Sequence, residues 1–207
     1  MIRILAALAL VAALSSPVHA QTVGAPYKDA EAFMYSKTGL FGQVAKFSSG
    51  VFTVTDAAVK EYPTLRGYLR AHYQKASVYE TAKANYHATG KPIILLGHSL
   101  GADATMRIAH WLKADNIPVA AIFAYDPTPA RWCVPDNVIA AIGWQRSYAF
   151  NLGGARIGPC RGNTKTAIEN HTVIGGHTYV DDAPVVHRLT RKHIGEVVHM
   201  IREMGAK

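Results

Sequence analysis

The stretch from Lys91 to Leu112, KPIILLGHSLGADATMRIAHWL, decides the fold of this 207-residue chain. It begins with PIILLG, an apolar run between Pro92 and Gly97 that is typical of a parallel strand buried on both faces. From Leu100 onward, apolar residues recur at helical spacing, so a helix is expected to follow. The five residues GHSLG, Gly97 to Gly101, therefore form a sharp turn from a buried strand into a helix.

The rest of the chain repeats this alternation of strands and helices. A second continuous apolar run, VAAIFAY, occupies Val119 to Tyr125 and ends at Asp126. Strands are expected at 32–39, 65–73, 92–97 and 119–125, and within 138–150 and 166–174. Helices are expected at 56–62, 77–90, 100–116 and 183–205. This order predicts a three-layer α/β/α sandwich with a mostly parallel central sheet, whose site lies at the carboxyl ends of the strands.

Local signals set the expected helix ends. Ser77 with Glu80 predicts a capping box, and Gly90 predicts the end of the same helix. Asp181 and Asp182 are expected to supply the N-terminal charge and cap of the last helix. The inner side of that amphipathic helix is expected to carry Val185, Val186, Leu189, Ile194, Val197, Val198 and Ile201. Residues 21–28 are expected to form a loose lead-in.

The N-terminus has the pattern of a signal peptide. Arg3 gives a positive start, and the apolar run from Ile4 to Leu14 is too short to span a bilayer. Small residues precede a cleavage position after Ala20. We therefore expect residues 1–20 to be removed and residues 21–207 to form one domain, exported to a periplasm or the medium. A retained membrane anchor is the alternative.

Export bears on the two cysteines and on the charge. Cys133 and Cys160 lie in Gly/Pro-rich segments, and a disulfide between them is expected in an oxidising compartment, with two free thiols as the alternative. The formal charge is +8, and loss of Arg3 with the leader leaves +7. The basic residues are scattered, which argues against a nucleic-acid site. No stable membrane insertion is expected after cleavage.

GHSLG also has the residues that an exposed nucleophile needs. A strained turn brings its neighbours close, and Gly97 and Gly101 leave room for them. The run GHSLGA is similar to the nucleophile turns of lipases and thioesterases. The chain from about Ala32 to the last helix resembles α/β-hydrolase-fold serine hydrolases of the lipase, esterase and thioesterase type, in a small secreted form. The alternative is a glycine-rich turn with a surface serine.

This resemblance implies a Ser–His–acid triad in the chain order serine, acid, histidine. Asp126 follows a strand in the expected place for the acid, with Asp136 as the weaker alternative. His177 lies after two glycines and before the last helix, so it is the expected base, with His171 second. Asp103 is too close to Ser99 to be the acid and is expected to serve a helix N-terminus.

The resemblance also implies two backbone donors that stabilise an oxyanion. The amide of Leu100 is one, and Leu40 is the candidate for the other, with Phe41 as the alternative. The histidines form no HExxH pair, so neither a metal nor another cofactor is expected.

The expected reaction is cleavage of a carboxylic ester or thioester through an acyl-enzyme on Ser99, with a small-molecule or lipid acyl compound as substrate. The chain has no segment long enough for a large cap domain, so we expect an open site with loops 41–52, 128–135 and 153–163 at its rim. Phe41, Phe52 and Trp132 are candidates for an apolar rim. A non-catalytic binding protein, an acyltransferase and a peptidase remain alternatives, and the oligomeric state stays open.

Overall fold

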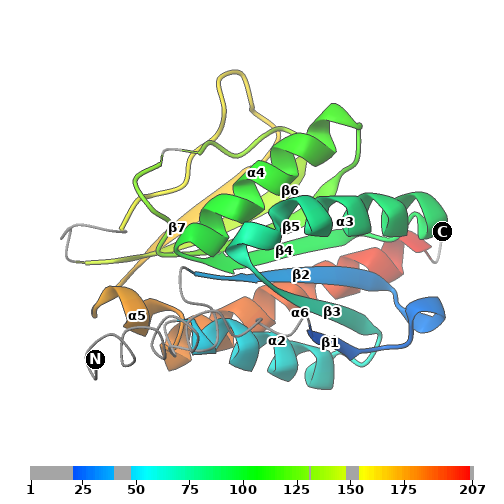
Figure 1. Ribbon diagram of the computed structural model, residues 1–207, viewed down its shortest axis with the longest axis horizontal. Coiled ribbons are helices and arrows are strands. Elements are labelled where there is room, and N and C mark those ends of the chain that lie inside the picture. Colours follow the sequence, from blue (N-terminus) through cyan, green and yellow to red (C-terminus); the bar gives the residue numbers. More distant parts are fainter. Residues whose placement is uncertain (1–20, 40–47, 131, 148–153, 206–207) are drawn as a thin grey trace, which may run out of the picture.

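The computed structural model describes residues 21–39, 48–130, 132–147 and 154–205. Within these residues the chain builds a seven-stranded sheet (Figure 1). Its strands are β1 (Gln21–Gly24), β2 (Ala32–Thr38), β3 (Leu65–Ala71), β4 (Ile93–His98), β5 (Val119–Tyr125), β6 (Val138–Arg146) and β7 (Ala167–Val173). The expected signal peptide lies outside the described residues.

The strands lie in the order β1-β3-β2-β4-β5-β6-β7. Five neighbouring pairs are parallel, and β1 alone among the described strands runs antiparallel, against β3. The expectation of a loose lead-in was therefore wrong, because residues 21–24 pair with Arg66 to Leu69. The chain moves outward from β2 to β3 and then returns past β2 to β4. The carboxyl ends of β2 and β4 thus flank a switch point, where ligands bind in open α/β sheets.

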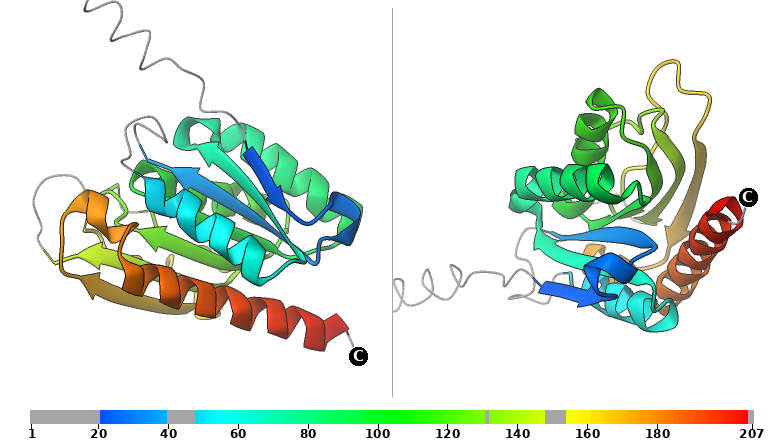
Figure 2. Two further views of the ribbon diagram at one scale, coloured as in Figure 1. Left: turned by 90° about the horizontal axis from the view of Figure 1, so that it is seen from below. Right: turned by 90° about the vertical axis from the view of Figure 1, so that its right-hand side faces the viewer.

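Helices cover both faces of the sheet (Figures 1 and 2). They are α2 (Ser49–Glu61), α3 (Lys75–Thr89), α4 (Leu100–Ala114), α5 (His177–Val180) and α6 (Pro184–Gly205), with short 3₁₀ helices η1 (Tyr27–Asp29) and η2 (His72–Gln74). Helices α2 and α6 share one hydrophobic cluster with the sheet, and α3 and α4 share the other. The three-layer α/β/α sandwich expected from the sequence is therefore confirmed.

The two apolar runs that predicted central strands are buried along their whole length. All residues of β4 and β5 are buried, with Ile94 and Leu96 on the α2/α6 side and Ile93 and Leu95 on the α3/α4 side. Complete burial of one such side chain contributes about 1.5–3 kcal/mol of transfer free energy. This central pair therefore provides a rigid base for the turns that follow it.

Helices α2 and α3 begin earlier than the sequence indicated. Helix α2 starts at Ser49, well before the expected Asp56, and α3 starts at Lys75. The capping box at Ser77 was wrong, because Ser77 lies inside the helix and its carbonyl accepts from Thr81. The glycine stop was right, since Gly90 has a φ of 66° and its N–H caps the Tyr86 carbonyl.

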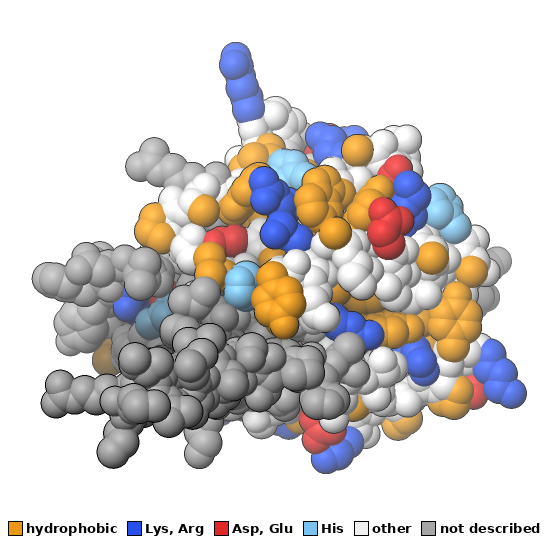
Figure 3. Space-filling model, in the orientation of Figure 1, with side chains coloured by type: hydrophobic (Ala, Val, Ile, Leu, Met, Phe, Trp, Pro, Cys, Tyr) orange, Lys and Arg blue, Asp and Glu red, His pale blue; other side chains and the backbone are white. Residues whose placement is uncertain are grey.

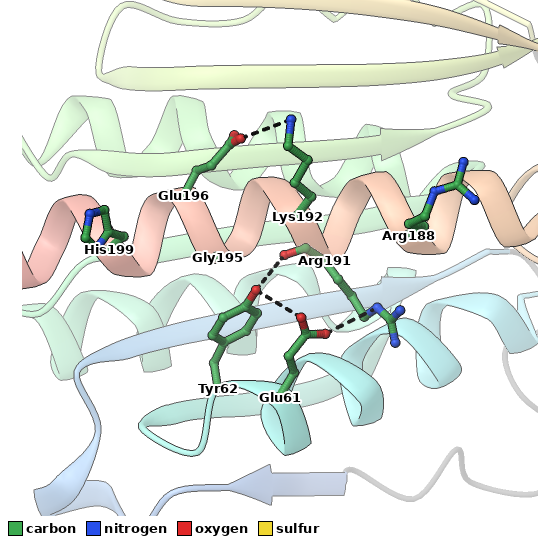
Figure 4. A pocket seen from close by; sticks show the side chains of 8 residues that line it. All are labelled: Glu61, Tyr62, Arg188, Arg191, Lys192, Gly195, Glu196 and His199. Carbon is green, nitrogen blue, oxygen red and sulfur yellow. Dashed lines mark hydrogen bonds and ion pairs between the residues drawn. The ribbon is translucent and has the colours of Figure 1, made fainter.

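Helix α6 packs against α2 through a close approach of two residues (Figure 4). A Cβ at Gly195 would lie 2.2 Å from the hydroxyl of Tyr62, so a larger residue would displace the Tyr62 ring from this contact. Val186, Ile194, Val197 and Val198 are buried as expected, and Leu189 and Ile201 pack against the core. The expectation was wrong for Val185, which is 42% exposed. Among the described residues, we find no helix with the length and apolar character required to cross a membrane.

Candidate active site

Ser99 lies on a strained turn between β4 and α4. Its φ of 56° and ψ of −126° are rare for a residue with a side chain, and its N–H donates to the Tyr125 carbonyl at 2.8 Å. The flanking glycines are required by contact. A Cβ at Gly97 would lie 2.4 Å from the Gly101 carbonyl oxygen, and one at Gly101 would lie 2.3 Å from that of Lys37. The backbone therefore fits this turn only when both positions are glycine.

Asp126 lies directly after β5 and is completely buried. Its φ of 42° is also in the left-handed region, and its N–H donates to the Trp144 carbonyl. Its Oδ1 accepts the backbone N–H of Arg146 at 3.1 Å, and the Arg146 Nε lies 3.6 Å from Oδ2. These contacts with β6 hold the carboxylate in one orientation.

His177 joins the other two side chains. Its Nδ1 lies 2.5 Å from Oδ2 of Asp126, and its Nε2 lies 2.9 Å from Oγ of Ser99. In the neutral ring, Nδ1–H donates to the carboxylate and Nε2 accepts the serine hydroxyl. The structure therefore brings together the three residues predicted from the sequence, in a continuous chain of hydrogen bonds.

Backbone amides lie beside the serine. Leu100 is the first residue of α4, so its N–H belongs to the helix end that lacks an intrahelical acceptor. Gly39 follows β2, and a Cβ on it would lie 3.3 Å from that of Ser99. The N–H of Gly39 donates to Ser48 Oγ at 2.8 Å, and the Gly39 carbonyl accepts from His72 Nδ1 at 2.9 Å. Leu40 and Phe41, the candidates for the second donor, lie outside the described residues.

Solved structures with a similar fold exist. The chain matches the RedJ thioesterase of the prodiginine pathway from Streptomyces coelicolor (TM-score 0.54, 12% identity, 90% of this chain and 92% of that one). It also matches human thioesterase 2 (TM-score 0.51, 15% identity, 82% of this chain and 97% of that one). A further match is esterase PE8 (TM-score 0.53, 14% identity, 86% of this chain and 98% of that one). The chain has the α/β-hydrolase fold. No protein-family model matches the sequence, and no curated protein matches it.

The hydrolase fold of this chain places a second histidine, His98, beside the site, where it is buried, and the sequence analysis missed it. His98 Nε2 donates to the His177 carbonyl at 3.0 Å, and its Nδ1 accepts from Ser48 Oγ at 2.8 Å. Ser48 in turn accepts from Gly39. The ring of His98 also lies 4.7 Å from that of His177. His98 thus links the segment after β2 to the segment that carries His177. Its place inside GHSLG was the available signal, but the pattern did not indicate its partners.

Asp181 corrects another expectation. Its carboxylate is buried, with Oδ1 3.5 Å from His98 Nδ1, so it does not cap α6. Burial raises its pKa to about 8, and the charge of Asp182 acts in the same direction, while the amides of Gly50 and Val51 oppose it. Asp182 instead accepts from Ser49 Oγ at the start of α2.

The alternative acid and base lie elsewhere. Asp136 pairs with Lys113 at 2.8 Å, and His171 lies 3.3 Å from Glu169 with its ring stacked on Trp144. Asp103 lies in the first turn of α4, as expected. Its carboxylate accepts from the Thr128 hydroxyl at 2.5 Å, and burial raises its pKa.

The candidate rim residues have separate positions. Phe52 lies in α2 and packs against the α2/α6 cluster, so it belongs to the core. Trp132 packs against the α3/α4 cluster and carries Arg107 over its ring at 4.9 Å from the centroid.

Cys133 and Cys160 form a disulfide, with an S–S distance of 1.98 Å.

Two groups of described side chains have the spacing of metal ligands. One contains His110 with the two cysteines, whose sulfur atoms are already bonded to each other. The other contains Glu169, His171 and His193, on β7 and α6. Neither group includes Ser99, Asp126 or His177.

A shallow hollow of about 590 Å³ lies between the end of α2 and α6 (Figure 4). Its acidic residues pair with neighbouring cations: Glu61 with Arg191 and Glu196 with Lys192, both at 3.4 Å. Its described residues therefore form no hydrogen-bonded arrangement comparable with that of Ser99, His177 and Asp126.

Proposed function

We propose that the protein is a serine hydrolase that cleaves a carboxylic ester or thioester through an acyl-enzyme on Ser99. The observation that carries this proposal is the hydrogen-bonded chain from Asp126 through His177 to a strained serine at a helix N-terminus. The similarity to thioesterases and an esterase supports it at the level of the fold.

The geometry assigns each residue a step. Ser99 Oγ attacks the substrate carbonyl while His177 Nε2 takes the hydroxyl proton, and His177 then donates that proton to the leaving group. Asp126 holds the ring by Nδ1 and stabilises its protonated form. The amide of Leu100 stabilises the oxyanion, with Leu40 as the proposed second donor. Water then hydrolyses the acyl-enzyme by the same proton route.

A fluorophosphonate probe tests the nucleophile directly. We expect the probe to label the purified protein, and Ser99→Ala to abolish both labelling and hydrolysis of p-nitrophenyl esters. Ser77→Ala, at an exposed position of α3, is the matched control and should leave both unchanged. Labelling that survives Ser99→Ala would disprove the assignment.

The acid has its own test. Asp126→Asn should lower kcat by about 10⁴-fold, because an amide holds the wrong tautomer of His177. Asp136→Asn removes the same charge at a distant position and should leave kcat unchanged. Equal losses in both variants would contradict the role of Asp126. A folded protein that binds esters without turnover would instead favour the non-catalytic alternative.

We also propose that the protein is exported after cleavage behind Ala20. The sequence pattern of residues 1–20 and the disulfide, which is stable in oxidising compartments, support this proposal. N-terminal sequencing of protein recovered from outside the cytoplasm should begin at Gln21. A mature chain that retains Met1 would contradict it.

A further inference from the structure

A hollow of about 240 Å³ adjoins the candidate active site. Leu100, the residue after Ser99, lines it, and so does Thr128, which follows Asp126 by two positions. His72 also lines it, and the Nδ1 of His72 donates to the carbonyl of Gly39, which lies beside Ser99. A group that is covalently attached to the reacting carbonyl can therefore reach this hollow.

The hollow has a surplus of positive charge. Lys75 and Arg107 line it, and neither has a carboxylate partner within 4.0 Å among the described residues. Asp103 is the one acidic residue among the described residues of its lining. Its carboxylate already accepts the hydroxyl and the N–H of Thr128. The two cations are therefore available to an external anion.

A third cation, Lys37, lies near this hollow and interacts with the charges around it. Lys37 is completely buried, and its Nζ has no hydrogen-bond partner among the described residues. Burial, followed by the charges of Arg70 and Lys75, lowers the pKa of Lys37. Burial, followed by the charges of Lys37 and Lys75, lowers the pKa of His72. An anion above this group would relieve the repulsion between the lysines.

The same hollow has an apolar wall. Trp132 lines it, and the guanidinium of Arg107 rests 4.9 Å from the centre of its ring. This cation–π contact restrains an otherwise exposed arginine. Figure 3 shows Lys and Arg side chains among hydrophobic ones on the face that carries α3 and α4. The lining therefore suits a short carbon chain that ends in a negative charge.

We propose that this hollow binds an anionic group, a carboxylate or a phosphate, carried by the ester or thioester that Ser99 attacks. The proposal rests on the proposed function and narrows its substrate class to anionic acyl compounds. Arg107 and Lys75 bind the anion, and Trp132 packs against the chain that connects it to the carbonyl.

Matched esters test the preference. Mono-p-nitrophenyl succinate carries a carboxylate where p-nitrophenyl butyrate carries a methyl group, and the 3-phosphonopropionate ester provides the phosphate-like arm. We expect kcat/KM to be about tenfold or more higher for at least one anionic ester, as for a charge-assisted hydrogen bond. The ratio of the kcat/KM values for the two anionic esters identifies the preferred anionic group. Added salt should reduce the preference. Equal or better hydrolysis of the butyrate would overturn the proposal.

Variants of the cations test the location. Arg107→Ala and Lys75→Ala should each lower kcat/KM for the preferred anionic ester by about tenfold. For p-nitrophenyl butyrate, kcat/KM should stay within about twofold of the wild-type value. Arg107→Glu should reverse the preference. Lys113→Ala removes a cation from the far end of the same helix and is the control. Equal losses on charged and neutral esters would show that the cations do not recognise the anion.

A binding measurement separates this proposal from the hydrolase assignment. Calorimetric titration of Ser99→Ala with each of the two anionic esters should show binding of at least one, which Arg107→Glu removes, whether or not the wild-type protein hydrolyses that ester. Absence of binding for both esters would overturn the anion site. Ser99-dependent hydrolysis of butyrate without an anionic preference would overturn it too, while the proposed function would stand.

Discussion

Nδ1 of His98 lies 3.5 Å from Oδ1 of Asp181, and both side chains are almost completely removed from solvent. Burial raises the pKa of Asp181 to about 8 from 3.8. Between these two pH values the unfolded chain releases a proton that the folded protein retains. Asp181 therefore makes the protein progressively less stable as the pH rises from about 4 to about 8.

Asp181→Asn should remove this pH dependence, because an amide does not ionise. The gain in unfolding free energy over wild type is expected to grow as the pH rises through this window, and urea denaturation at pH values of about 5, 6.5 and 8 measures it. Asp29→Asn removes a carboxylate at an exposed position of η1, away from Asp181, and should show no such growth. A constant difference for Asp181→Asn would contradict the raised pKa.

The turn at Ser99 predicts a sharp contrast between two glycines. Gly101→Ala places a Cβ 2.3 Å from the carbonyl oxygen of Lys37 and 2.7 Å from that of Thr38, so backbone must move. We expect a loss of about 1–3 kcal/mol in stability and a large loss in probe labelling of Ser99. A Cβ at Gly158 meets nothing within 4 Å, and Gly158→Ala should stay within about 0.5 kcal/mol of wild type. Similar effects in the two variants would contradict the steric explanation.

Part of the architecture could be predicted because its signals are local. The strands β4 and β5 are continuous apolar runs that are buried on both faces. The positions of Ser99, Asp126 and His177 followed from the chain order that the resemblance implied. The structure adds the geometry, with 2.9 Å between Ser99 Oγ and His177 Nε2.

Other features could not be predicted because they depend on contacts between distant segments. His98 bonds to Ser48 and to His177, which are 50 and 79 positions away. Gly50 lies inside α2, and glycine is required there because a Cβ would be 1.7 Å from the Asp181 carbonyl oxygen, in a segment far along the chain. Strand β1 has mostly exposed residues, so its pairing with β3 left no hydrophobic pattern.

Lys37 should affect stability in the opposite direction from Asp181. Burial, with the charges of Arg70 and Lys75, lowers its pKa from 10.5 to about 7. Below about pH 7 the folded protein holds a buried charge, and this cost decreases as the pH rises toward 10.5, where the unfolded chain also loses its proton.

Lys37→Met should therefore stabilise the protein most at or below about pH 7, and the gain should shrink toward pH 10. Urea denaturation at several pH values between these limits measures it. Lys28→Met, at an exposed position of η1, is the control and should show no trend in this range. A gain that increases with pH would contradict the assigned direction.

The bond between Cys133 and Cys160 should act mainly on the unfolded chain. Backbone contacts already hold its two segments together, since Cys160 N–H donates to the Val134 carbonyl at 2.9 Å and Val134 pairs with Pro159. The cysteines are 27 positions apart, and closing a loop of that size contributes about 3 kcal/mol through the entropy of the unfolded state.

Replacing both cysteines by serine should therefore lower the unfolding free energy by about 3 kcal/mol while ester hydrolysis well below the melting temperature stays near wild type. Urea denaturation with and without a reductant measures the change. The reductant should destabilise wild type to the level of the double variant and have no effect on that variant. A loss of hydrolysis in the still-folded variant would show instead that the bond positions the site, for example through the neighbouring Trp132 wall of the hollow.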